Sequence, residues 1–194
     1  SLQNGQFSFE TIGDQPPQGL TGSGLLQVVA ELVRAGVVER NGRLAAEPPV
    51  LAGLLERKQA ARSLYLTPTR DIWLTQKDIR ELQKAKGAIR AAIQVLMQRL
   101  GLQANDLQRI ILTGSFGGQL DVAAVTELGM IPAVPAERIH NIPNGAGLGA
   151  AMFLLDEGFT LAEALAQRTE QVDLDQNADF HRIFVEALAF QPGS

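Results

Sequence analysis

The sequence RIILTGSFGG, residues Arg109–Gly118, joins a short aliphatic run to a glycine-rich turn. Ile110, Ile111 and Leu112 are enough for a buried β-strand but too few for a helix. Helical spacing resumes from Leu120 to Leu128. A glycine turn between a strand and a helix leaves N–H groups free at the helix N-terminus, where a phosphate or nucleotide can approach closely. The same glycines also suit a plain tight turn, because the spacing lacks both the Walker lysine and the dinucleotide fingerprint.

Two further glycine-rich segments also precede helical patterns. Gly19–Gly24 leads into an apolar helix pattern, and Thr21 or Ser23 is the candidate cap. Pro143–Ala151 follows a short strand candidate at Arg138–Ile142. Ligands of α/β domains sit at the carboxyl ends of strands, so three such turns favour one shared cleft. Plain helix capping is the alternative for each of them.

The longest predicted helix begins after Thr75 and ends at Gly101. Thr75 and Asp78 form a start similar to a capping box. An apolar stripe follows on one face, made of Ile79, Leu82, Ile89, Ile93, Leu96 and Leu100. Lys86 interrupts this stripe, and the periodicity favours an ammonium that reaches out to water along the helix surface. The functional alternative is that Lys86 points at a buried anion.

The rest of the pattern favours an α/β domain, with a mixed sheet covered by helices, over the whole of residues 1–194. The remaining predictions are a loop with a short helix at Glu47–Arg62, a β-hairpin at Leu64–Thr67 and Ile72–Leu74, helices at Phe159–Arg168 and Phe180–Leu188, and an edge strand at Val172–Leu174.

Composition excludes several classes of function. The net charge of −4 gives no electrostatic footprint for nucleic acid. The absence of cysteine excludes disulfides, thiolate catalysis and cysteine-ligated metals in this chain, and His140 and His181 are too far apart in sequence to suggest a metal site. No apolar run reaches the ~18 residues of a membrane span and no signal peptide is visible, so we expect no membrane partner and a cytoplasmic protein.

Four motifs resemble one known family. They are Gly19–Leu25, Leu74–Ile89, Leu112–Gly118 and Asn144–Ala151, and the long-helix motif is the most specific of them. The chain is similar over nearly its whole length to the C-terminal ATPase domain of the corrinoid reductive activators, also called the DUF4445 family. Its fold, ribonuclease H-like, is that of the acetate and sugar kinase, heat-shock 70 and actin superfamily.

The resemblance implies a nucleotide site, with no catalytic and no metal-binding residue in this chain. The nucleotide-binding residues that it implies are Gln83, Lys86, Gly114, Ser115, Phe116 and Gly117. The glycine turn before the first helix adds Gly22, Ser23 and Gly24 as an anion-facing helix start. The intact protein would bind ATP or ADP with magnesium. A [2Fe-2S] cluster on a separate domain would deliver an electron to a cobalt(II) corrinoid, driven by ATP hydrolysis. Candidate partners are the other domains of the parent chain, a corrinoid protein and a second copy for a homodimer.

Departures from the family pattern limit what this chain does alone. The superfamily's acidic Asp-x-Gly-Thr phosphate loops do not occur, Gly114-Ser115 replaces the usual Gly-Gly, Thr21 replaces a cysteine and Pro143 replaces a glycine. Phosphoryl transfer needs magnesium ligands and a group that positions water, so we expect the C-terminal lobe of a longer multidomain protein, inactive by itself. The rival interpretations are a docking module with a decayed nucleotide site and a lobe of a small-molecule kinase.

The two carboxylates nearest the central turn are unconvincing phosphoryl-transfer residues. Asp121 and Glu127 are interpreted as solvated positions of the helix that follows the turn.

Overall fold

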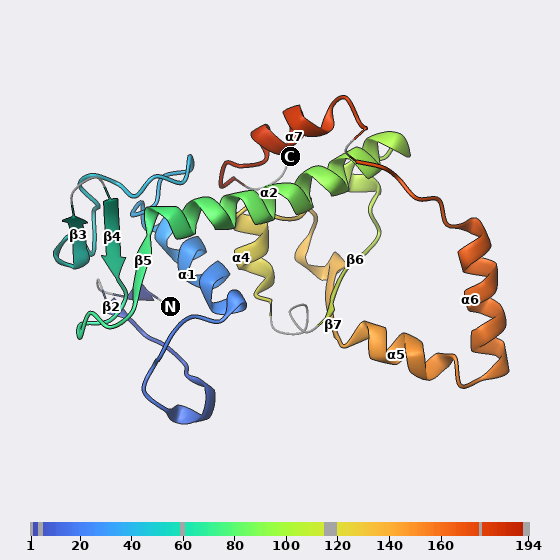
Figure 1. The fold of residues 1–194 in the computed structure, drawn as a ribbon, viewed down its shortest axis with the longest axis horizontal. Helices are drawn as coiled ribbons and strands as arrows, with labels where there is room; N and C mark the ends of the chain where they lie inside the picture. The colour runs from blue at the N-terminus through green and yellow to red at the C-terminus, as the bar shows by residue number, and fades with distance from the viewer. Residues whose placement is uncertain (1, 4–5, 59–60, 115–119, 175, 192–194) are drawn as a thin grey trace.

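One long helix, α2 (Gln76–Arg99), organises the molecule. The computed structural model describes residues 2–3, 6–58, 61–114, 120–174 and 176–191. Helices α1 (Gly22–Arg34) and α4 (Val122–Glu127) pack on each other below α2 in the view of Figure 1, and α7 (Phe180–Glu186) lies on its other side.

Local sequence sets both ends of α2 as predicted. The Thr75 hydroxyl accepts a hydrogen bond from the Asp78 backbone N–H at 3.1 Å, and the Asp78 carboxylate accepts one from the Thr75 N–H at 2.8 Å. The helix ends before Gly101, which adopts a positive φ of 65°. The predicted start and end are therefore confirmed.

The buried face of α2 differs from the predicted apolar stripe. Ile89, Leu96 and Leu100 of that stripe are exposed, and Leu100 is 70% exposed. The buried residues of α2 are Ile79, Gln83, Lys86, Gly87, Arg90, Ala91 and Val95. Ile79 and Lys86 belong to the predicted stripe, but α7 and the residues after it cover the neighbouring, partly polar side of the helix, which periodicity alone does not reveal.

An antiparallel sheet packs beside the start of α2. Its strands are β3 (Leu55–Lys58), β4 (Ala61–Tyr65) and β5 (Trp73–Thr75), in that order. Leu64 pairs with Leu74 across β4 and β5, which confirms the predicted hairpin. The structure adds β3 within the segment that was expected to be a loop with a short helix.

A parallel pair of strands carries the central glycine turn. Strand β6 (Ile110–Thr113) pairs with β7 (Ile139–Pro143), and Ile110 lies opposite Ile139. Ile111 is 53% exposed, so the expectation of a fully buried strand is wrong. Within the described residues this sheet has two strands, and Ile111 and Thr113 of β6 are exposed on one of its faces.

Two apolar clusters hold the body together. The larger one joins α1, α4 and the β4–β5 hairpin, and includes Leu32, Leu64, Leu128 and Phe190. The smaller one joins Ala91 and Val95 of α2 to Ile183 of α7. A short strand pair, β1 (Leu2–Gln3) with β2 (Gln6–Phe7), packs at the edge of the larger cluster.

Two helices extend away from this body. Helices α5 (Gly145–Met152) and α6 (Asp156–Arg168) follow β7 and reach outward in Figure 1. Neither helix buries a residue, and Leu154 between them is 86% exposed. We call α5 and α6, with the residues that join them, the arm. The edge strand predicted at 172–174 is wrong, because no strand forms there.

Candidate functional site

The central glycine turn follows β6 directly. Gly114 has a φ of 96°, a conformation that favours glycine, and makes a parallel bridge with Pro143 at the end of β7. Among the described residues, no atom lies within 4 Å of the ideal position of a Cβ on Gly114. Ser115, Phe116 and Gly117 lie outside the described residues.

A second glycine turn lies beside the first. The Gly145 N–H donates to the Thr113 hydroxyl at 2.8 Å, so the start of α5 contacts the end of β6. Asn144 caps α5 by accepting the Gly147 N–H at 3.1 Å. Two of the three glycine turns therefore meet at the carboxyl ends of one parallel strand pair, where ligands of α/β folds bind.

The third glycine segment begins α1. Thr21 is the cap, because its hydroxyl accepts the Gly24 N–H at 3.0 Å. Gly22, Ser23 and Gly24 form the first turn of the helix. The bond from Gln27 Nε2 to Asp121 Oδ2, 3.4 Å, links this helix to the beginning of α4.

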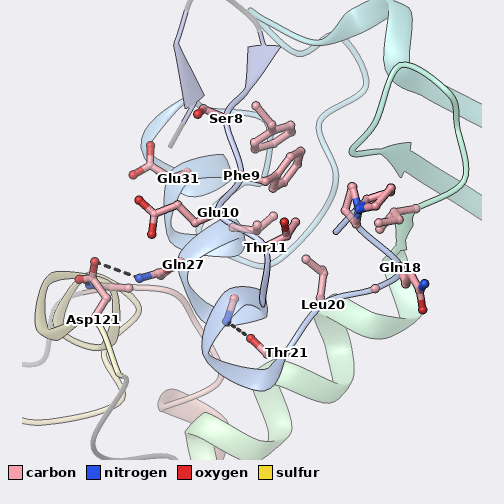
Figure 2. A pocket seen from close by; sticks show the side chains of 18 of the residues that line it. Ser8, Phe9, Glu10, Thr11, Gln18, Leu20, Thr21, Gln27, Glu31 and Asp121 are labelled. Carbon is pink, nitrogen blue, oxygen red and sulfur yellow. Dashed lines mark hydrogen bonds between the residues drawn. The ribbon is translucent and has the colours of Figure 1, made fainter. Parts of the chain in front are cut away.

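A cleft of about 720 Å³ opens beside the start of α1. Thr21, Gly24, Phe9 and Leu20 contribute to its walls, together with Asp121 from the start of α4. Figure 2 shows that the segment before α1 closes the cleft on one side.

Carboxylates dominate the charge of this cleft. Glu10, Glu31 and Asp121 lie along one side of it (Figure 2), whereas Arg34 is its one lining cation within the described residues and pairs with Glu31 at 2.5 Å. An anion would meet net repulsion here unless a cation came with it. Asp121, which is half-buried, also caps α4 by accepting the Ala124 N–H at 2.9 Å.

The predicted helix residues form a separate buried polar site on α2. Lys86 is 1% exposed, and its ammonium donates a hydrogen bond to the Ala189 carbonyl. The expected reach of Lys86 to water is therefore wrong. Gln83 is also buried, and its amide donates to the Leu188 carbonyl at 2.8 Å and to the Asn41 carbonyl at 3.1 Å.

Burial lowers the pKa values of two cations, Lys86 and Arg90, at this second site. Burial lowers the pKa of Lys86 to about 8, with a further contribution from the neighbouring charge of Arg90. Burial also lowers the pKa of Arg90, which stays protonated at any physiological pH. Two buried cations side by side suit oxygen acceptors, and the acceptor that the structure supplies to Lys86 is a backbone carbonyl.

The predicted site residues thus fall in three places. Gly114 lies beside the start of α5, Gly22–Gly24 lie at the start of α1, and Gln83 and Lys86 lie under the residues after α7. Of these described residues only Gly24 lines the cleft. No sequence pattern predicts the contact of Leu188 and Ala189 with α2, because it joins residues about 100 positions apart.

A family model matches nearly the whole length of this chain. The family model described as the C-terminal domain of RACo, the ASKHA domain, matches residues 2–193. The chain belongs to this family. The family predicted from the sequence motifs, and the actin-like ATPase fold of α/β class, are thereby confirmed.

Individual relatives agree with this assignment. The corrinoid activation enzyme RamQ of Eubacterium limosum is 30% identical over 200 residues, which cover 97% of this chain and 34% of RamQ. A Methanosarcina barkeri reductase, named for a Co(II) methylated amine-specific corrinoid protein, is 27% identical over 126 residues, 65% of this chain and 19% of its own length.

A solved structure, a reductive activator for corrinoid, iron-sulfur protein, superposes with a TM-score of 0.83 at 26% identity. The superposition covers 96% of this chain and 30% of that one. This chain therefore spans about a third or less of these relatives.

The described residues contain neither a membrane-spanning helix nor a cluster of metal ligands. No helix among them is long and apolar enough to cross a membrane. No group of three or more His, Cys, Asp or Glu side chains among them could hold a metal ion.

Proposed function

We propose that this chain is the nucleotide-binding lobe of an ATP-dependent reductive activator of corrinoid proteins. The observation that carries the proposal is the meeting of two glycine turns at the carboxyl ends of β6 and β7, within a domain of the ASKHA family. The names of the relatives, a corrinoid activation enzyme and a reductive activator, support the activity of the parent protein.

The nucleotide would lie against the turn after β6. Gly114–Gly117 would contact the adenosine, with Gln83 and Lys86 on α2 as further contacts and Gly22–Gly24 as an anion-facing helix start. The positive φ of Gly114 and the open space around it support the first of these roles, because a backbone without side chains lets a ligand approach closely.

The parent would be a longer multidomain protein of the cytoplasm, of which residues 1–194 form one lobe. Support comes from the arm, whose large apolar side chains are exposed to solvent, and from the exposed face of β6. The other domains of the parent, a corrinoid protein and a second copy of the chain are the proposed partners.

The cofactors of the parent would be ATP or ADP with magnesium, and a [2Fe-2S] cluster. The 194 residues contain no cysteine, so the thiolates that hold such a cluster would come from a separate domain. The described residues offer no metal cluster, and the magnesium ligands would likewise come from the rest of the nucleotide site.

A pair of glycine variants tests nucleotide binding by the parent protein. Gly114→Ala adds a methyl group at the turn after β6, and we expect it to weaken ADP binding at least about tenfold, about 1.4 kcal/mol, in a calorimetric titration with magnesium. Gly101→Ala is the matched control, because Gly101 also has a positive φ, 65°, and open space for a Cβ, at the far end of α2.

Equal ADP affinities in the two variants would remove the turn after β6 from the nucleotide site. Absence of ADP binding in the wild type would instead favour the docking module, which the uncovered arm also suits. Phosphorylation of a small molecule by the parent would favour the kinase lobe.

A further inference from the structure

The residues that follow α7 lie across the polar face of α2. We call this segment, Ala187–Gln191, the latch. Its carbonyls accept hydrogen bonds from the two α2 side chains proposed for the nucleotide: Gln83 donates to Leu188, and Lys86 donates to Ala189. Both donors are almost completely buried, so the latch satisfies groups that would be costly to leave unpaired.

Phe190 anchors the latch from its other side. Its ring is fully buried in the larger apolar cluster, and the Lys86 ammonium lies 5.5 Å from the ring centroid. Its N–H donates to the Arg40 carbonyl at 2.7 Å, and the Arg40 guanidinium donates to its carbonyl at 3.5 Å. Three successive carbonyls of the latch therefore accept hydrogen bonds.

Two glycines make room for the latch backbone. A Cβ on Gly129 would lie 1.9 Å from the Gln191 carbonyl oxygen, and a Cβ on Gly87 would lie 3.3 Å from the Ala187 carbonyl oxygen. The first distance is a severe clash with backbone, which cannot move without lifting the segment. Side chains are thus absent where the latch passes closest to α2 and to the end of α4.

We propose that the latch and a nucleotide compete for Gln83 and Lys86. This inference rests on the proposed function, since it concerns the same nucleotide site. The carbonyl oxygens of the latch accept the hydrogen bonds that ribose or phosphate oxygens would otherwise accept. A nucleotide therefore gains these donors only when the latch lifts, and the site is closed in the conformation described here.

Competition has a quantitative consequence for affinity. When only a fraction of the protein has its latch lifted, the apparent dissociation constant rises by the inverse of that fraction. A change that lifts the latch without altering Gln83 or Lys86 should therefore strengthen nucleotide binding. Gly129→Ala is such a change, because it acts on Gln191 from the end of α4.

Hydrogen exchange of the latch in the parent protein tests the competition. We expect saturating ADP to accelerate exchange of the wild-type peptide covering residues 187–191 by about tenfold or more. We expect Gly129→Ala to accelerate it similarly without ADP and to tighten ADP binding by a comparable factor. Gly101→Ala is again the control, because it carries the same backbone strain at a positive φ with no neighbour to clash with.

The outcomes separate this inference from the proposed function. ADP binding that depends on Gly114 but leaves latch exchange unchanged, or slows it, would overturn the competition and leave the nucleotide site standing. Absence of ADP binding in every protein would overturn both. Hydrogen exchange of the latch in the wild type, with and without ADP, tests the competition even if Gly129→Ala does not fold.

Discussion

The buried ammonium of Lys86 predicts an unusual dependence of stability on pH. Its pKa is about 8 in the folded chain, against an ordinary value of 10.5. Between these values the unfolded chain binds more protons than the folded one, so the free energy of unfolding should rise as pH rises from about 8 to 10.5. Lys86→Met removes the titrating group, and with it this rise.

The size of the effect follows from the gap between the two pKa values. Each pKa unit corresponds to about 1.4 kcal/mol, so the wild type should gain about 3 kcal/mol relative to Lys86→Met across the window. Arg90, the cation whose charge acts on Lys86, remains protonated throughout and does not add to the change.

Urea unfolding between pH 7.5 and 10.5, followed by far-ultraviolet circular dichroism, measures the difference. Lys84→Met is the control, because Lys84 lies on the same helix, is exposed and pairs with Glu81. The free energy of unfolding of Lys84→Met should change with pH in the same way as that of the wild type. Parallel curves for the wild type and Lys86→Met would refute the assignment of Lys86 as a buried cation.

Further predictions concern packing and capping. Phe190→Ala should lower the free energy of unfolding by about 3–5 kcal/mol in urea, because the ring is fully buried; a loss below about 1 kcal/mol would contradict that burial. Thr75→Ala should cost about 1 kcal/mol through the lost cap of α2, measured in the same way. Gly42→Ala should cost more than about 1 kcal/mol, because Gly42 has a φ of 81° and its Cβ would lie 2.1 Å from the Gln83 amide oxygen. Gly53→Ala, with open space and no positive φ, should stay within about 0.5 kcal/mol of the wild type.

Features that depend on neighbours in sequence were predictable. The cap formed by Thr75 and Asp78 and the glycine after α2 set the bounds of that helix. The turn between β4 and β5 set the hairpin. In each case the residues that form the feature lie within a few positions of one another, so local preference and structure agree.

Features that depend on distant segments were not predictable. Lys86 interrupts the apolar stripe, where its ammonium was expected to reach water, but the carbonyl of Ala189, 103 residues away, accepts its hydrogen bond and the Phe190 ring lies beside it. Strand β3 forms because β4 pairs with it, although its own sequence has a weak strand pattern. The carboxylates of the cleft, Glu10, Glu31 and Asp121, come from three separate segments, so no single sequence motif predicts that they lie together.

The exposure of the arm, α5 and α6, would affect how the proposed parent protein folds. α5 has 8 residues and α6 has 13, and helices of this length are marginal in water without packing partners. In the multidomain parent proposed above, their stability would come from the surface that covers them, so helix formation and docking would be a single thermodynamic event. Because α5 begins with a hydrogen bond to Thr113 at the end of β6, that event also fixes the strand that leads into the glycine turn. Loss of the contacts that cover the arm would then also disturb the glycine turn of the proposed nucleotide site.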